Sequence, residues 1–326
     1  MKIKKIAVLT SGGDSPGMNT ALRAVVRTCA YSKVECVGVS RGFQGLINDE
    51  IKNLNTRSVR GIINRGGTML YSARSKEFRS KAGRIKAYEN VKKHKIDALV
   101  VIGGDGSFTG AMIFQNEFNV PVIGIPGTID NDLFGTSHTL GYDTALNTVM
   151  EAIDKIRDTA ISHDRLFFVE VMGRDAGHIA LNSGIAIGAQ EILIPEENIG
   201  IDELVISLKK SKKSGKTSSI VVVAEGDKTG KNVFELAKNV EKKFPDYEIK
   251  VSVLGHMQRG GSPSCFDRVL ATRMGVKAVE SLIDGNFSHM VGVIEGKLSL
   301  TPLKSAIKGK SKINSELLRV SQIMNT

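Results

Sequence analysis

The chain has 326 residues, of which 41 % are hydrophobic and 24 % charged, so it is long enough for two average domains and is not composed like a disordered protein. Its 45 lysines and arginines exceed its 34 aspartates and glutamates, which gives a formal net charge of +11. Nucleic-acid binding is not favoured, because aromatic residues make up only 5 % and the lysines are spread along helical stretches, so solvated lysine faces and anionic small-molecule substrates explain the excess.

The beginning of the chain and its cysteines favour a soluble, cytoplasmic protein. The first apolar run, residues 6–9, is far too short for a signal peptide, and no later run reaches the length of a membrane span. The three cysteines, Cys29, Cys36 and Cys265, show no CxxC spacing and are odd in number. We therefore expect no membrane partner, no disulfide scaffold and no zinc site.

Short β-rich runs alternate with helical patterns along most of the chain. The expected strands are residues 5–10, 34–40, 97–103, 121–127, 165–172, 219–226, 249–255 and 290–296. A helix is expected over 143–160, where apolar residues recur at helical spacing. Because the strands are continuously apolar and separated by helices, we expect an α/β fold of two interlocked α/β domains with parallel-rich sheets covered by helices. Ligands of such folds bind beyond the carboxyl ends of the strands.

The segment GGDGS, residues 103–107, follows one of these strands. Glycines let backbone N–H groups approach a phosphate, and a helix over 108–118 would add its positive N-terminal end. Asp105 is suited to hold Mg²⁺, which prefers oxygen ligands and shared phosphates. The pattern is neither a Rossmann fingerprint nor a Walker A motif. A tight turn capped by Asp105 explains the segment equally well.

The segment PGTIDND, residues 126–132, follows the next strand. If it is extended, the side chains of Thr128, Asp130 and Asp132 face the same way. One carboxylate would then accept the proton of a hydroxyl substrate while another orients a cation or a base. An Asx-rich turn is the structural alternative.

Further glycine-rich segments carry cations. Arg74 ends NRGGTMLYSAR, Arg174 follows the strand 165–172, and His256 and Arg259 lie in GHMQRGGSP. Each residue alone is explained as a surface residue. Together these segments fit phosphoryl transfer, which needs a metal ligand, cations around the migrating phosphoryl group and a base for the acceptor. Acyl transfer lacks support, because neither a GxSxG elbow nor a Cys/His pair stands out.

In combination these motifs resemble those of the bacterial ATP-dependent phosphofructokinases. GGDG alone also occurs in diacylglycerol kinases and NAD kinases, so the resemblance depends on its combination with TIDND, MGR and GHxQRGG. The matching segments follow the expected order to about residue 300: LTSGGDSPGMN, INRGGTMLYSAR, VIGGDGS, PGTIDND, VEVMGRDAGH and LGHMQRGGSP. The resemblance implies a homotetrameric glycolytic kinase that uses Mg²⁺ and ATP to convert fructose 6-phosphate into fructose 1,6-bisphosphate and ADP.

The resemblance also implies two domains and a role for each matching residue. The larger, ATP-binding domain would be 1–140 plus 252–303, and the smaller, sugar-phosphate-binding domain 141–251 plus 304–326. The residues implied to bind ATP are Gly13, Arg74, Ser75, Gly104, Asp105, Gly106 and Ser107, with Asp105 also holding Mg²⁺. The implied catalytic residues are Asp130, as the base for the 1-hydroxyl of the sugar, with Thr128, Asp132 and Arg174. The residues implied to bind the sugar phosphate are Thr128, Asp130, Met172, Gly173, Arg174, Glu225, His256 and Arg259, with Arg165 and Lys250 from a neighbouring subunit.

Two small residues indicate the phosphoryl donor. The motifs of pyrophosphate-using relatives resemble GGDDS and PKTIDND, whose bulkier side chains crowd the α-phosphate and add a cation for pyrophosphate. This chain has Gly106 and Gly127 at those positions, which favours ATP. A pyrophosphate-dependent or other-sugar phosphotransferase of the same superfamily is the first alternative. The second is a non-catalytic nucleotide-sensing subunit, against which four intact residues argue: Asp105, Asp130, Arg74 and Arg174.

The chain departs from the family pattern in two places. Lys250 replaces a common arginine and lacks its bidentate fork, so we expect weaker binding of the sugar phosphate. The residues that match effector positions for ADP or phosphoenolpyruvate are Arg23, Arg27, Arg157, Glu191 and Lys216. Thr56 replaces another common effector arginine, and the segment 209–216 departs from the usual GKKH. These departures leave regulation by ADP or phosphoenolpyruvate open.

Overall fold

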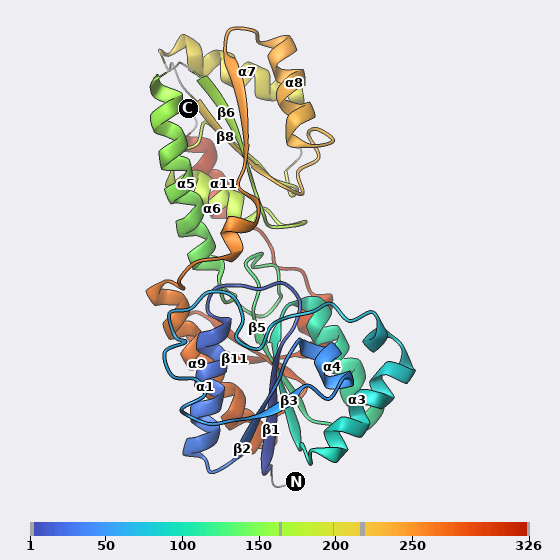
Figure 1. The fold of residues 1–326 in the computed structure, drawn as a ribbon. Coiled ribbons are helices and arrows are strands. Elements are labelled where there is room, and N and C mark those ends of the chain that lie inside the picture. Colours follow the sequence, from blue (N-terminus) through green and yellow to red (C-terminus); the bar gives the residue numbers. More distant parts are fainter. Residues whose placement is uncertain (1–2, 163–164, 198, 216–218, 325–326) are drawn as a thin grey trace. The chain divides into compact units, whose positions relative to one another are not determined.

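The computed structural model describes residues 3–162, 165–197, 199–215 and 219–324, which form two compact units (Figure 1). The described residues of unit 1 lie within Met1–Ile129, Leu133–Thr144 and Arg259–Ser311. Those of unit 2 lie within Asp130–Asp132, Ala145–Gln258 and Lys312–Thr326. The chain therefore passes between the units several times, and one of these passages falls inside the PGTIDND segment.

Unit 1 is built on a seven-stranded sheet within the described residues, in the order β11-β10-β5-β4-β1-β2-β3. Its strands are β1 (Lys5–Thr10), β2 (Glu35–Val39), β3 (Ile51–Leu54), β4 (Ala98–Gly103), β5 (Val122–Pro126), β10 (His289–Ile294) and β11 (Lys297–Pro302). The inner strands pair in parallel, whereas β3 and β11 pair antiparallel at the two edges. The carboxyl ends of the parallel strands consequently share one edge of the sheet.

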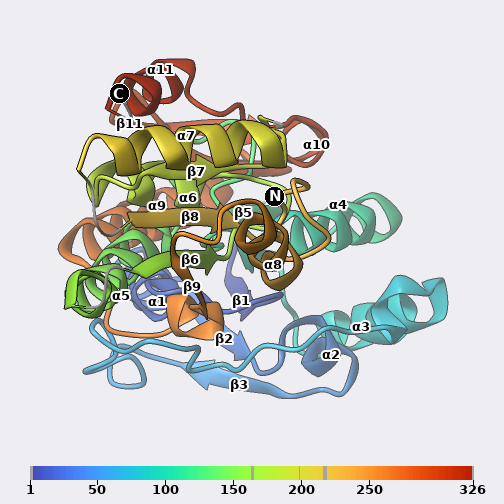
Figure 2. The ribbon, with the colours of Figure 1, turned by 90° about the horizontal axis from the view of Figure 1, so that it is seen from above.

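Helices cover both faces of this sheet (Figure 2). One face packs against α1 (Met18–Tyr31) and α9 (Cys265–Ile283). The other packs against α2 (Gly42–Ile47), α3 (Lys81–Lys93), α4 (Asp105–Phe118) and α10 (Leu303–Lys308), with the short helix η1 (Glu77–Arg79) between. Along β1, Val8 lies in the first core and Leu9 in the second, because successive side chains of a strand point to opposite faces. This two-sided burial is why the strands are continuously apolar.

Unit 2 is built on a smaller parallel sheet, in the order β7-β8-β6-β9. Its strands are β6 (Arg165–Val171), β7 (Glu191–Leu193), β8 (Ser219–Ala224) and β9 (Glu248–Val253). The helices α7 (Ile201–Lys213) and α8 (Val233–Lys243) pack on one face, and α5 (Tyr142–Ser162), α6 (His178–Ala186) and α11 (Ser315–Met324) lie on the other (Figure 1). The short helix η2 (Gly255–Arg259) follows β9.

The predicted α/β class, with parallel-rich sheets covered by helices, is confirmed. Three strands, β3, β7 and β11, were not predicted from the sequence. All three are edge strands, and β3 and β11 also carry polar, partly exposed residues, so they lack the continuous apolar pattern of the inner strands. No helix in the described ranges is both long and apolar enough to cross a membrane.

Besides the excursion at Asp130–Asp132, the units change after Thr144, before Arg259 and after Ser311, whereas the predicted domain ranges change at residues 140, 252 and 303. Residues 304–311 lie with unit 1 because Leu303 and Ala306 of α10 are buried in its core. Residues 252–258 lie with unit 2, where β9 pairs with β6. The assignment of one ligand to each domain stays a prediction.

Candidate active site

Three neighbouring strands of unit 1, β1, β4 and β5, have their carboxyl ends on the same side of its sheet. β4 lies between β1 and β5, and the register pairs Thr10 with Ile102 and Gly103 with Pro126. A side chain placed on Gly104 would bring its Cβ to 3.8 Å from the Cβ of Thr128. The glycine-rich segments after β1, β4 and β5 therefore begin side by side, as expected for parallel strands.

Gly103, at the end of β4, and Gly106, just after it, are glycine for different physical reasons. A Cβ on Gly103 would lie 2.5 Å from the carbonyl oxygen of Ser11 and 2.6 Å from Oγ of Ser107, so close packing excludes a side chain there. A Cβ on Gly106, by contrast, would have no atom within 4 Å. Packing within the chain gives no reason for Gly106, and its exposed backbone leaves room for a ligand.

The helix α4 begins at Asp105, three residues before the predicted helix. Its N-terminal cap is Gly104, which has no side chain to accept the N–H groups of the first turn. Asp105 and Gly106 are exposed, whereas Ser107 is buried. The first-turn N–H groups and the helix dipole together favour an anion at this point.

The loop after β1 is crowded by a guanidinium group. Nη1 of Arg259 donates a hydrogen bond to the carbonyl oxygen of Asp14, at 3.2 Å. A Cβ on Gly13 would lie only 2.7 Å from the same nitrogen atom. Gly13 and Arg259, two predicted ligand-binding residues, are thus neighbours in unit 1.

Arg74 and Ser75 lie before the short helix η1. The hydroxyl of Ser75 donates to Oε1 of Gln44, at 2.7 Å, and accepts the N–H of Phe78, at 3.0 Å. Arg74 is exposed. The Ser75 hydroxyl therefore holds the start of η1, and the contact of both residues with ATP stays a prediction.

The PGTIDND segment is not extended throughout, so the condition under which Thr128, Asp130 and Asp132 would face the same way is not met. β5 ends at Pro126, the chain bends at residues 129–130, and Asn131 adopts a left-handed φ of 53°. Alternation of side chains requires an extended backbone. Thr128 belongs to unit 1, whereas Asp130 and Asp132 belong to unit 2.

Asp130 and Arg174 form an ion pair within unit 2. Nε of Arg174 lies 3.2 Å from Oδ2 of Asp130. The Asp130 side chain is 1 % exposed and that of Arg174 is 45 % exposed. A buried carboxylate needs such a partner, because burial removes its hydration. The structure thus brings together the predicted base and the predicted cation.

The loop after β6 is held by two polar side chains. Oε1 of Glu225 accepts the N–H groups of Gly173, at 3.2 Å, and of Arg174, at 2.6 Å. Oε1 of Gln258 accepts the N–H of Met172, at 3.1 Å. These bonds fix a backbone in which Gly173 has φ 141° and Arg174 has φ 53°, conformations that most residues avoid.

Gln258 had been given no role from the sequence. It is fully buried, and its Nε2 donates to the carbonyl oxygen of Gly255, at 3.0 Å. The signal for it was present, since Gln258 lies inside the GHMQRGGSP segment. His256, in the same segment, is exposed, and its contact with the sugar stays a prediction.

Arg165 and Lys250 meet at one carboxylate. Nε of Arg165 donates to Oε2 of Glu248 at 2.7 Å, and Nζ of Lys250 lies 2.6 Å from Oε1 of Glu248. The hydrogen bond from Lys250, followed by that from Arg165, lowers the pKa of Glu248 to about 2. Sequence reasoning missed Glu248, although it lies two residues from Lys250 on the same strand and so on the same face.

The predicted effector residues of unit 1 lie on α1. Arg23 and Arg27 are four residues apart and therefore on one face of the helix, Arg23 half-buried and Arg27 exposed. Thr56, which replaces an effector arginine of the family, is exposed. Nothing in their surroundings tests effector binding.

The predicted effector residues of unit 2 make contacts within the chain. Arg157 donates from Nη2 to the carbonyl oxygen of Ile187. Glu191 accepts the hydroxyl of Ser207, and burial raises the pKa of this glutamate. Lys216 lies outside the described residues. The effector site therefore stays a prediction.

The donor set of unit 1 suits one kind of metal ion. Among the residues with described positions, no three His, Cys, Asp or Glu side chains group as a metal site, and Cys29, Cys36 and Cys265 are free thiols. Mg²⁺ keeps several waters and binds through one or two carboxylates plus substrate phosphates. A single exposed carboxylate, Asp105, at a helix end suited to phosphates fits a magnesium ion that arrives with a nucleotide.

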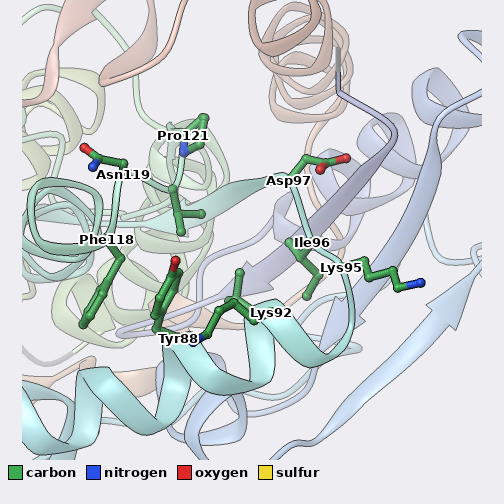
Figure 3. Close-up of a pocket in the computed structure, with 10 residues that line it drawn as sticks. Tyr88, Lys92, Lys95, Ile96, Asp97, Phe118, Asn119 and Pro121 are labelled. Atoms are coloured by element: carbon green, nitrogen blue, oxygen red, sulfur yellow. The ribbon is translucent and has the colours of Figure 1, made fainter. Parts of the chain in front are cut away.

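A hollow of about 190 Å³ lies at the opposite edge of the unit 1 sheet, where β4 and β5 begin (Figure 3). The rings of Tyr88 and Phe118 stack there with centroids 4.5 Å apart, and Nζ of Lys92 lies 4.8 Å from the Tyr88 ring centroid. The Asp97 carboxylate accepts the N–H of Lys5, at 2.9 Å. None of the predicted site residues lines this hollow.

Comparison with known proteins identifies one family. Residues 5–282 match the model of the family described as phosphofructokinase. The chain is 50 % identical over 318 residues to ATP-dependent 6-phosphofructokinase 2 of Bacteroides thetaiotaomicron, covering 98 % of this chain and 97 % of that protein. It is 52 % identical over 322 residues to ATP-dependent 6-phosphofructokinase 1 of Thermus thermophilus, covering 99 % of each.

The fold also matches a solved structure of a larger relative. The phosphofructokinase of Saccharomyces cerevisiae superposes with a TM-score of 0.89 at 37 % identity, covering 99 % of this chain and 47 % of that chain. This chain thus spans about half the length of the yeast chain, and nearly the whole of the two bacterial enzymes. By the family match and by its identity to these relatives, the chain belongs to the phosphofructokinase family.

Proposed function

We propose that the chain is an ATP-dependent 6-phosphofructokinase, which transfers the γ-phosphoryl group of ATP to the 1-hydroxyl of fructose 6-phosphate. Identity of about half over nearly the full length of two relatives with that name supports the activity. The structural observation that carries the mechanism is the buried carboxylate of Asp130 beside the guanidinium of Arg174. A proton acceptor next to a fixed cation is what phosphoryl transfer to a hydroxyl requires.

The nucleotide is proposed to bind at the carboxyl edge of the unit 1 sheet. The first-turn N–H groups of α4 and the open backbone at Gly106 receive its phosphates. Asp105 holds Mg²⁺, which neutralises charge on the phosphate oxygens when it is bound. The further residues proposed to bind ATP are Gly13, Arg74, Ser75, Gly104 and Ser107.

The sugar phosphate is proposed to bind through residues of unit 2 together with Thr128 and Arg259. Asp130 accepts the proton of the 1-hydroxyl, and Arg174 stabilises the charge of the migrating phosphoryl group. Glu225 and Gln258 keep the loop that carries Arg174 in its left-handed conformation. The other residues proposed to contact the substrate or order the site are Asp132, Met172, Gly173, His256, Arg165 and Lys250.

Gly106 and Gly127, the two glycines that bear on the choice of donor, differ in their surroundings. A side chain at Gly106 would enter open space beside the phosphate site. A Cβ on Gly127 would lie 2.7 Å from Cε of Met18 and 3.2 Å from Cγ2 of Ile102, both fully buried. Side-chain packing in unit 1 therefore disfavours a larger residue at position 127 unless Met18 moves, whereas nothing within the chain constrains Gly106. Both glycines support ATP over pyrophosphate.

The activity is tested by measuring fructose 1,6-bisphosphate formed from fructose 6-phosphate, in parallel with ATP and with pyrophosphate. We expect turnover with ATP and Mg²⁺, none with pyrophosphate, and loss of activity when EDTA removes the metal. Turnover with pyrophosphate alone would support the pyrophosphate-dependent alternative. Absence of turnover with both donors would support another sugar acceptor or the nucleotide-sensing subunit.

The proposal includes a cytoplasmic homotetramer in which Arg165 and Lys250 reach the sugar phosphate of a neighbouring subunit. The three free cysteines fit a reducing compartment. ADP or phosphoenolpyruvate is proposed to bind at Arg23, Arg27, Arg157, Glu191 and Lys216. Sedimentation equilibrium tests the tetramer, and velocity curves that stay unchanged with either effector would contradict the regulation.

Replacing Lys250 by arginine is expected to lower KM for fructose 6-phosphate by about two- to tenfold, because a guanidinium offers a second hydrogen bond to the phosphate. KM for ATP should not change, and it serves as the internal control. Steady-state kinetics with each substrate varied in turn gives both constants. An unchanged or higher KM for the sugar phosphate in Lys250→Arg would contradict the role given to Lys250.

A further inference from the structure

A three-residue ionic cluster, Arg165–Glu248–Lys250, lies where β6 and β9 begin. The two strands are parallel neighbours, and their register pairs Arg165 with Glu248. Glu248 uses one carboxylate oxygen for each cation, with Oε2 at 2.7 Å from Nε of Arg165 and Oε1 at 2.6 Å from Nζ of Lys250. The two positive groups are therefore joined through a single negative group.

This cluster adds little to the stability of the fold. Arg165 is partly buried, and Glu248 and Lys250 are about half exposed. Ion pairs at such exposure contribute little, because water and salt screen them. The two strands are already joined by their backbone hydrogen bonds along the whole of β9. The pKa of about 2 keeps Glu248 ionised at any pH at which the protein is assayed, so its charge is always present.

Glu248 contacts the two cations, Arg165 and Lys250, in the way that a phosphate group would. A bound phosphate places separate oxygen atoms against each cation, and here a carboxylate does so. A phosphate group that reaches Arg165 and Lys250 must either displace Glu248 or bind close to its negative charge. Both cases weaken the attraction, because like charges a few ångström apart repel each other.

We infer that Glu248 is an internal competitor that lowers the affinity of Arg165 and Lys250 for the sugar phosphate. The inference rests on the proposed function, in which these two cations bind the 6-phosphate of the substrate. The cost of displacing or approaching Glu248 is the same for any ligand whose phosphate reaches the two cations, so fructose 6-phosphate and free phosphate lose affinity by a similar factor. Glu248 thus sets the affinity of this phosphate-binding position.

The test is Glu248→Gln, which keeps the shape of the side chain and removes its charge. We expect the Kd of fructose 6-phosphate, measured calorimetrically without ATP, and its KM to fall by about three- to tenfold at low ionic strength. The change should shrink as salt is added, while kcat and KM for ATP stay the same. Inorganic phosphate should gain affinity by a similar factor, because the same negative charge is removed beside the same two cations.

Glu151→Gln is the matched control. Glu151 lies on α5 in unit 2 and pairs with Lys155 at 2.7 Å, so its replacement makes the same change of charge away from the cluster. Its Kd for fructose 6-phosphate should equal that of the wild type. Melting temperatures of both variants check that the fold is kept.

The outcomes separate the inference from the proposed function. A wild-type protein that neither binds nor phosphorylates fructose 6-phosphate contradicts the proposed function. A wild-type protein that does both, with an unchanged or weaker affinity in Glu248→Gln, overturns only the inference. Weaker binding in the variant would show that Glu248 positions the two cations rather than competing for them.

Discussion

Replacing Asp130 by serine or asparagine is expected to lower kcat by about 10²–10⁴-fold, the range over which a general base contributes. The carboxylate is buried and lies 3.2 Å from the guanidinium of Arg174, so solvent cannot easily supply another proton acceptor at this point. KM for both substrates should stay broadly the same, because the lost group acts on the hydroxyl proton and not on a phosphate. Steady-state kinetics of purified protein gives these constants.

A surface aspartate provides the control for this substitution. Asp154 lies on α5 and is exposed, and Asp154→Asn should leave kcat and both KM values unchanged. Melting curves of the variants show whether the loss of activity reflects unfolding. A folded Asp130 variant that loses less than about tenfold in kcat would remove Asp130 from the role of base.

The inner architecture could be predicted because each inner strand is buried on both faces. A continuous apolar run such as 98–103 fits a strand that is buried on both faces of a sheet. The glycines that follow it indicate where the chain turns. The edge strands β3 and β11 have mixed composition, since one side of an edge strand meets water. The alternation of polar and apolar residues in β3 and β11 is too weak to distinguish these strands from loops in the sequence.

The candidate site was less predictable than the sheet. In an extended segment, a period of two places Thr128, Asp130 and Asp132 on one face. The left-handed Asn131 ends this alternation. Asparagine is one of the few residues that adopt this conformation, but the sequence does not show at which asparagine it occurs. Glu248 and Arg165 are 83 residues apart, and their contact depends on the register between two strands. Neither strand alone specifies that register.

The backbone around Arg174 depends on the absence of a side chain at Gly226. A Cβ there would lie 2.1 Å from the carbonyl oxygen of Arg174, 3.0 Å from its carbonyl carbon and 3.2 Å from Cα of Asp175. All three contacts are with backbone atoms, which no change of rotamer can relieve. The loop after β6 must therefore move if position 226 carries any side chain.

Such a movement would act on catalysis through Arg174. The same loop is fixed by the neighbouring Glu225, which accepts the N–H groups of Gly173 and Arg174. Pushing the carbonyl of Arg174 away would stretch these bonds and move the guanidinium from its place beside Asp130. A displacement of about 1 Å in a catalytic arrangement can lower the rate by about 10²-fold.

Gly226→Ala is accordingly expected to lower kcat by about 10- to 100-fold, with little change in KM for ATP, because the residues proposed to bind ATP belong to unit 1. Gly200→Ala is the matched control in unit 2, since its Cβ would meet only Oε2 of Glu203, at 4.0 Å. Kinetics and melting curves of both variants distinguish a displaced loop from general unfolding. Wild-type kcat in a folded Gly226→Ala protein would mean that the position of Arg174 does not limit the reaction, and the mechanism would then depend on Asp130 without its cation.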